Sequence, residues 1–247
     1  FGVAVISVTV WGLRETVVPD RSRLNLRQLG QSYVTLLTNR HFMATSLTIA
    51  GAIGAIYALA TILPFILMQE LGFSPTEFGL GMLMQSGSFF AGSLVVRRLM
   101  KHNSAYRLVM PGLGVILLGS ALILSLLIGD TTFLRVMVPV AFYTFGIAFV
   151  MPAMSTAALA PFPSIAGAAS SLMGFMQMGA GLLVGSLAAL FDNPVVALAV
   201  LIPMMGTVAS LAYVVYRRNP HLAEPEPRQE AISGPPVGRT WMPAKKD

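Results

Sequence analysis

The side chains that could do acid–base, nucleophilic or metal chemistry lie outside the long apolar segments of this 247-residue chain. The histidines His41, His102 and His221 fall in polar connectors or in the C-terminal tail. The apolar segments contain serines but no Asp, Glu, Lys or Arg. A nucleophilic serine needs a base, and a metal needs several ligands. The sequence therefore predicts no catalytic residue, no metal site and no enzymatic activity.

The polar groups that remain in the apolar segments are uncharged, and two of them are amides, Gln85 and Gln177. An amide without a partner is costly in lipid, so both must face protein or a wet cavity. The sequence leaves open whether each amide bonds a neighbouring helix or lines a cavity. The candidate cavity-lining and substrate-binding residues are Tyr57, Gln85, Phe89, Tyr143 and Gln177.

Composition places these residues in a membrane. The chain is 55% hydrophobic and 11% charged, with a mean hydropathy of +0.74, whereas soluble domains carry about 25% charge. Cysteine is absent, which excludes disulfides and thiolate chemistry. Six uncharged segments are long enough to cross a bilayer, so we predict an all-α membrane protein with a six-helix bundle over 42–216. The predicted spans are 42–68, 78–96, 108–129, 136–159, 166–190 and 195–216.

The segment 166–190 is unusually rich in small residues, since fourteen of its 25 residues are Gly, Ala or Ser. Small side chains let helix backbones approach closely in a membrane. We therefore expect Gly174, Gly181 and Gly185 to pack against neighbouring helices, and the segment to lie inside the bundle with helices around it.

The remaining segments are shorter or polar. Residues 1–13 are apolar but too short to span, and we interpret them as the end of a preceding transmembrane helix. Residues 14–41 form a basic connector, either an amphipathic surface helix or an ordinary linker. Residues 217–247 are rich in Pro and charge and are expected to be a disordered tail.

Basic residues mark one side of the membrane. Of the 16 Lys and Arg, 15 lie in the 14–41 connector, the 97–107 connector or the tail, and only Arg135 lies in the alternate connectors. Cytoplasmic loops carry such an excess. We therefore predict a multi-pass protein of the inner (cytoplasmic) membrane with its C-terminus in the cytoplasm. The net charge of +6 is then an orientation signal, and nucleic acid is not an expected partner.

Polarity differs between the spans. The third and sixth spans hold few polar groups and are expected to be peripheral, and the other four to face inward. Pro64 and Pro152 interrupt two of the inward-facing spans and predict points of flexure.

This pattern, with the segments ILPFILMQELGFSPTEFGL, GSLVVRRLM, FGIAFVMPAMSTAAL and AGAASSLMGFMQMGAG, resembles the C-terminal half of a major facilitator transporter. The segments look like the Bcr/CflA drug-resistance subfamily of proton antiporters. The resemblance implies alternating access, with an N-terminal half of the same transporter as partner and a proton gradient rather than a cofactor as energy source. One departure is Val96 before Arg97–Arg98, where the superfamily often carries an acidic residue.

The substrate class follows from the lining expected of this half. Apolar, methionine-rich spans with few amides favour efflux of small amphipathic drugs. A carrier for a defined polar solute, such as a nucleoside or sugar, is the alternative, and a non-transport membrane partner protein is a third. Proton coupling requires a titratable group, and we expect it outside this part of the protein, in the N-terminal half.

Overall fold

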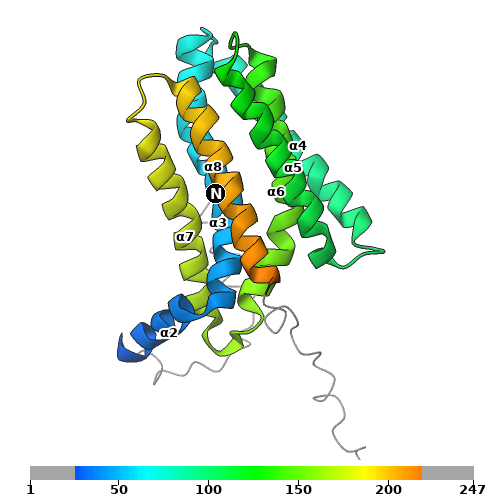
Figure 1. Ribbon diagram of the computed structural model, residues 1–247, viewed down its shortest axis with the longest axis vertical. Helices are drawn as coiled ribbons and strands as arrows, with labels where there is room; N and C mark the ends of the chain where they lie inside the picture. Colours follow the sequence, from blue (N-terminus) through cyan, green and yellow to red (C-terminus); the bar gives the residue numbers. More distant parts are fainter. Residues whose placement is uncertain (1–25, 219–247) are drawn as a thin grey trace, which may run out of the picture.

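The computed structural model describes residues 26–218 as a bundle of long helices (Figure 1). The predictions for residues 1–13 and for most of the tail lie outside the described residues. No strand occurs between residues 26 and 218. The elements are α2 (Leu26–Thr38), α3 (Arg40–Pro64) with the π-helical turn η2 (Phe65–Glu70), α4 (Pro75–Leu99), α5 (Ala105–Leu124) with the 3-10 turn η3 (Ser125–Leu127), α6 (Phe133–Leu159), the 3-10 turn η4 (Pro163–Ile165), α7 (Ala166–Ala188) and α8 (Pro194–Arg217).

Helices α3 to α8 are each long and apolar enough to cross a membrane, which confirms the predicted fold class. Each predicted span coincides with one of these helices to within a few residues at either end. The span predicted over 42–68 continues through Pro64 without a break, and the backbone changes there from α-helix to the π-helical turn η2. Proline has no N–H to donate, so a change of helix type at this position has a direct cause.

Two of the helix starts are fixed by side-chain caps. Ser74 Oγ accepts a hydrogen bond from the Glu77 backbone N–H at 3.3 Å, and Glu77 Oε2 accepts one from the Ser74 N–H at 2.8 Å. This reciprocal pair is a capping box, and Pro75 follows it in the first turn of α4. Asn193 Oδ1 accepts from the Val195 N–H at 2.7 Å at the start of α8. Both starts are therefore determined by local sequence.

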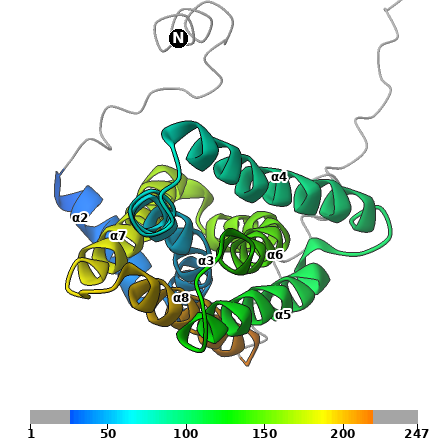
Figure 2. The ribbon, with the colours of Figure 1, turned by 90° about the horizontal axis from the view of Figure 1, so that it is seen from above.

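Helices α3 and α6 occupy the middle of the bundle. Viewed from above, α5 and α8 lie side by side on one flank, while α4 and α7 stand apart with α3 and α6 between them (Figure 2). The buried share of the apolar stretch is 67% in α3 and 61% in α6 but only 22% in α4 and 11% in α7. Within the described residues, α4 and α7 therefore each pack on one side only.

The prediction that 166–190 is surrounded by helices is wrong for the described part of the chain. Helix α7 packs along α3 and makes only slight contact with α6 and α8. Gly167 and Gly179 have no atom within 4 Å of a built Cβ. Small residues on several faces of a helix show where another helix could approach closely. They do not show that such a helix is supplied by the described part of this chain.

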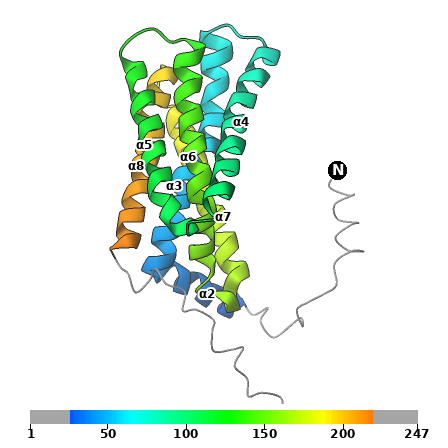
Figure 3. The ribbon, with the colours of Figure 1, turned by 90° about the vertical axis from the view of Figure 1, so that its right-hand side faces the viewer.

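The 14–41 connector contains the helix α2, which lies at one end of the bundle against α3 and α7 (Figure 3). Leu36 is fully buried, and the Tyr33 hydroxyl lies 3.1 Å from Ser171 Oγ of α7. Leu29 and Leu37 stay exposed. An apolar residue anchors the helix to the bundle while further apolar residues face outward, and its place on a membrane surface stays a prediction.

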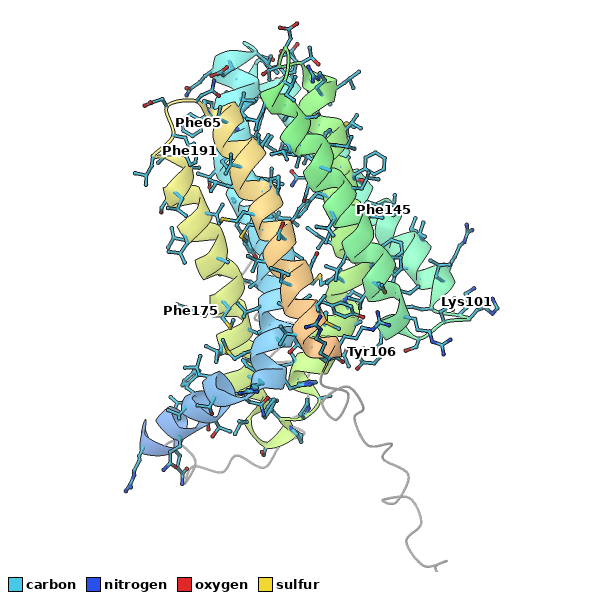
Figure 4. All side chains as sticks on the ribbon, viewed as in Figure 1. Phe65, Lys101, Tyr106, Phe145, Phe175 and Phe191 are labelled. Atoms are coloured by element: carbon cyan, nitrogen blue, oxygen red, sulfur yellow. The ribbon has the colours of Figure 1, made fainter. Side chains whose placement is uncertain are left out.

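Charged residues divide between the two ends of the bundle. Helix α2, the C-terminal end of α8 and the connector that contains Lys101 lie toward one end (Figures 1 and 4). The loops before α4, α6 and α8 lie at the other end, where Arg135 donates to the carbonyl oxygen of Asp130 at 2.9 Å. The two ends are called the basic end and the acidic end below.

Close backbone contact at glycine holds the central helices together. A Cβ built on Gly119 of α5 would lie 2.7 Å from the backbone N of Tyr143 and 3.0 Å from the carbonyl O of Pro139 in α6. On the same helix, Gly114 has no atom within 4 Å. Because Gly119 and Gly114 share one helix but only Gly119 meets a neighbour, substituting each in turn distinguishes the effect of interhelical contact from that of helix propensity.

We predict that Gly119→Ala destabilises the bundle by about 1–3 kcal/mol, because the methyl group meets backbone that cannot move by itself. Gly114→Ala is the matched control and should be neutral or stabilising by up to about 1 kcal/mol. Thermal unfolding of the two variants in detergent, followed by circular dichroism, measures the difference. Equal unfolding temperatures would contradict the contact.

Candidate substrate-binding site

A pocket of about 270 Å³ lies where α4 meets α3 and α6. Its lining residues are Ile56 from α3, Gln85, Ser86 and Phe89 from α4, and Thr144 from α6. Gln85 and Phe89 stand four residues apart, so they share one face of α4. Two of the five predicted binding residues are therefore brought together here.

Helix α4 is held against α6 by contacts on either side of this pocket. Ser88 Oγ donates a hydrogen bond to the carbonyl O of Ala141 at 2.7 Å. A Cβ built on Gly92 would lie 2.8 Å from the carbonyl O of Phe145. A serine and a glycine thus let the two backbones approach closely, and this contact sets the position of Gln85.

The polar groups of the pocket differ in whether they have a hydrogen-bond partner. Thr144 Oγ1 lies within hydrogen-bonding distance of two backbone carbonyls, that of Val140 in its own helix at 3.0 Å and that of Gln85 in α4 at 3.4 Å. The Gln85 amide is half-buried and has no hydrogen-bond partner among residues 26–218. The pocket therefore presents an apolar wall with two polar side chains that have no partner among the described residues, the Gln85 amide and the Ser86 hydroxyl. Gln85 lines the pocket and its side chain bonds no helix among the described residues, and a role in substrate binding stays a prediction.

Tyr143 does not line this pocket. Its side chain is fully buried, and its hydroxyl donates to the carbonyl O of Gly51 at 3.2 Å. Successive helical residues point about 100° apart, so Thr144 faces α4 while Tyr143 faces α3. Tyr143 thus ties α6 to α3 in the core, and the binding role expected for it is not supported by its position.

Tyr57 and Gln177 lie at the contact between α3 and α7 rather than in the pocket. Gly181 of α7 packs directly against Cβ of Tyr57, whose side chain remains 40% exposed. Gln177 is half-buried, and its side-chain amide has no hydrogen-bond partner among the described residues. A role in substrate binding stays a prediction for both residues.

The three glycines expected to pack against helices behave differently. Gly181 meets Tyr57 and Gly54, and a Cβ built on Gly185 would lie 3.2 Å from Thr61 Oγ1. Gly174 has no atom within 4 Å, so the packing prediction is wrong for it within the described residues. Gly181 and Gly185 lie four residues apart on the face toward α3. Gly174 lies seven residues before Gly181, on nearly the same face two turns earlier, where no neighbouring atom is within 4 Å.

Sequence reasoning missed the burial of His41. It was expected in a polar connector, but it lies in the first turn of α3, only 5% exposed. Its Nε2 lies 2.7 Å from the carbonyl O of Ala157 in α6, and its ring packs edge-on against Tyr216 of α8. Its Nδ1 is buried without a partner in the described part of the chain. The cap residue Asn39 beside it is the signal that could have placed His41 inside the helix.

A family model described as Major Facilitator Superfamily matches residues 1–186. The chain belongs to the major facilitator superfamily. Two similar proteins are the multidrug transporter MdfA of Escherichia coli O157:H7 and that of Shigella boydii serotype 4 (strain Sb227). Each is 25% identical over 184 residues, which cover 71% of this chain and 44% of the relative.

An uncharacterized transporter of the major facilitator type, YdgK of Bacillus subtilis (strain 168), is 21% identical over 220 residues. The match covers 86% of this chain and 53% of the relative. The chain thus spans about half the length of the curated superfamily members it matches.

The pocket predicts different outcomes for two substitutions. Gln85→Leu should leave unfolding unchanged and alter which substrates bind, because it removes the free amide of the pocket. Tyr143→Phe should destabilise the bundle by about 0.5–1.5 kcal/mol, since it removes a buried hydrogen bond, without altering substrate preference. Thermal unfolding of the chain, paired with a comparison of the small molecules that each variant binds, tests both. Binding that falls only in proportion to folded protein in Gln85→Leu would show that Gln85 is a packing group.

Proposed function

We propose that this chain is the C-terminal half of a secondary transporter that exports small amphipathic drugs by alternating access, driven by the proton gradient. The observation that carries the proposal is a mostly apolar pocket with a free amide and a free hydroxyl, built on a half-bundle whose flanking helices α4 and α7 are each uncovered on one side. The likeness to MdfA, named a multidrug transporter, supports the substrate class. The narrower Bcr/CflA assignment rests on the residue resemblance alone.

The uncovered faces support a second helical bundle as partner. Phe90 of α4 is 64% exposed and Leu182 of α7 is 71% exposed. Gly87 and Gly174 on the same two helices have open space where a Cβ would be. Small residues beside large apolar ones suit close helix packing in a membrane. We propose that the N-terminal half of the same transporter covers these faces and completes the cavity.

The pocket chemistry supports an amphipathic substrate over a polar one. Sugars and nucleosides need several converging hydrogen-bond groups. Here the hydroxyl of Thr144 is engaged with backbone carbonyls, which leaves the Gln85 amide and the Ser86 hydroxyl as the polar side-chain groups of the pocket. An apolar body with one acceptor or donor fits this lining.

The distribution of charge supports an orientation. Described basic residues concentrate at the end of the bundle where α2 lies, and Arg135 lies at the opposite end. We propose that the basic end and the C-terminus face the cytoplasm of a cell with this protein in its inner membrane, since cytoplasmic loops carry excess Lys and Arg.

The proposed coupling predicts where protons are bound. Glu70, Glu77, Asp130 and Asp192 lie at the acidic end and not within the central part of any described helix. Changing each singly to Gln or Asn in the complete transporter should preserve proton release on drug binding. The physical reason is that a coupling group must gain and lose a proton as the transporter changes between access states. A carboxylate at the rim, in contact with water, stays in the same surroundings and has no cause to do so.

Two measurements test this. Ethidium export from vesicles that contain the complete transporter should stop when a protonophore collapses the pH gradient, and export that continues would refute proton coupling. Loss of drug-induced proton release in any one rim variant, at unchanged drug affinity, would place the coupling carboxylate in this half.

A further inference from the structure

A second cavity opens at the acidic end of the bundle, separate from the pocket of Gln85. It measures about 540 Å³ and lies between the end of α3 with η2, the last turns of α7 and the start of α8. It shares no lining residue with the pocket of Gln85. Its volume falls within the range of about 300–1,000 Å³ common for small-molecule sites. The small residues Gly185, Ala188 and Ala189 of α7 leave this space open.

Two carboxylates line the cavity, Glu70 from η2 and Asp192 from the α7–α8 connector. Neither has a hydrogen bond or an ion pair within residues 26–218, and no Lys, Arg or His lines the cavity. A different acidic side chain at this end, Glu77, does have a partner, since it accepts hydrogen bonds from Ser74 in the capping box. Glu70 and Asp192 therefore leave an uncompensated negative charge at the cavity.

The basic residue at this end does not neutralise that charge. Arg135 donates to three backbone carbonyls of the segment that precedes α6, those of Ser125, Ile128 and Asp130, at 3.3, 3.1 and 2.9 Å. It lies in the first turn of α6 and does not line the cavity. The carboxylates are thus left to attract a positive group from outside the chain.

Two aromatic rings complete the lining, Phe65 from η2 and Phe191 from the α7–α8 connector (Figure 4). Phe65 is 47% exposed, so its ring is not fully covered by other side chains of the bundle. Aromatic faces attract organic cations, and the attraction grows where water is partly excluded. The rest of the wall is made of apolar side chains such as Ile62 and Ala197 together with the uncharged polar side chains of Thr61 and Gln69.

We propose that this cavity binds an amphipathic organic cation, with its charged group between Glu70 and Asp192 and its apolar body against Phe65 and Phe191. An anion is disfavoured by the carboxylates. A metal ion is disfavoured because no group of three or more metal-ligating side chains occurs among the described residues. The same chemistry is offered by a drug cation and by the ammonium headgroup of phosphatidylethanolamine. The proposal stands on this cavity and does not depend on the efflux function above.

The absence of native cysteine allows a local probe. Ala189→Cys places a thiol on the cavity wall at an exposed position, in the complete transporter held in phosphatidylglycerol nanodiscs. A cationic methanethiosulfonate should react with this thiol faster than an anionic one. Tetraphenylphosphonium should protect the thiol in a concentration-dependent way.

Substitutions assign the protection to the cavity. Glu70→Gln and Asp192→Asn, each in the Ala189→Cys background, should raise the half-protecting concentration of tetraphenylphosphonium about tenfold, as expected for loss of roughly 1.4 kcal/mol of charge attraction. Glu77→Gln is the matched control, because it removes the same charge at the same end outside the cavity. Gln85→Leu should leave the protection unchanged, which separates this site from the pocket on α4.

A comparison of nanodiscs with and without phosphatidylethanolamine distinguishes the two sources of the cation. Slower modification in nanodiscs that contain phosphatidylethanolamine, reversed by Glu70→Gln, would assign the site to the lipid headgroup. Protection only by tetraphenylphosphonium would assign it to drug-like cations. The proposal is overturned if neither protects the thiol, or if protection is the same in Glu70→Gln, Asp192→Asn and the unsubstituted cavity.

Discussion

Close approach of helix backbones at glycine is the constraint on which the rest of this bundle depends. In lipid there is no hydrophobic drive to bring helices together, so van der Waals contact and interhelical hydrogen bonds must do it. Cβ atoms built on Gly51 and Gly146 would lie 2.8 Å from the backbone N of Ala209 and 2.7 Å from the carbonyl O of Gly112. These contacts hold α3 against α8 and α6 against α5, and the buried Tyr143 hydroxyl joins the two pairs through Gly51.

The same contacts decide where chemistry can occur. With α3 and α6 packed against α8 and α5, the two remaining helices are attached at one side each. Helix α4 is attached through Ser88 and Gly92, and helix α7 through Gly181 and Gly185. Both cavities lie beside these one-sided attachments, the smaller between α4 and the core and the larger where α7 and α8 diverge from α3. The sites are therefore products of incomplete packing in this half-bundle.

Much of the fold could be predicted because its signals are local. An uncharged stretch of about 20 residues specifies a span, and Ser74 or Asn193 specifies where a helix begins. The candidate site was harder to predict from the sequence, because the residues that line it depend on the rotation of each helix about its axis. Sequence places Tyr143 and Thr144 side by side and cannot tell which faces α4. It also cannot show which small residues meet a neighbour, and so Gly174 and Gly181 looked alike. His41 was misplaced since its burial depends on Ala157 and Tyr216, which are distant in sequence.

The central claim is that the uncovered faces of α4 and α7 meet a second bundle while α5 and α8 face lipid. Spin labels attached to Gly87→Cys and Gly174→Cys, compared with Leu118→Cys on α5 and Leu211→Cys on α8, measure this through collisions with lipid-dissolved oxygen. In the complete transporter, labels at 87 and 174 should collide with oxygen far less often than those at 118 and 211. In the isolated 247-residue chain, all four should collide at similar rates. Equal collision rates at the four positions in the complete transporter would contradict the account.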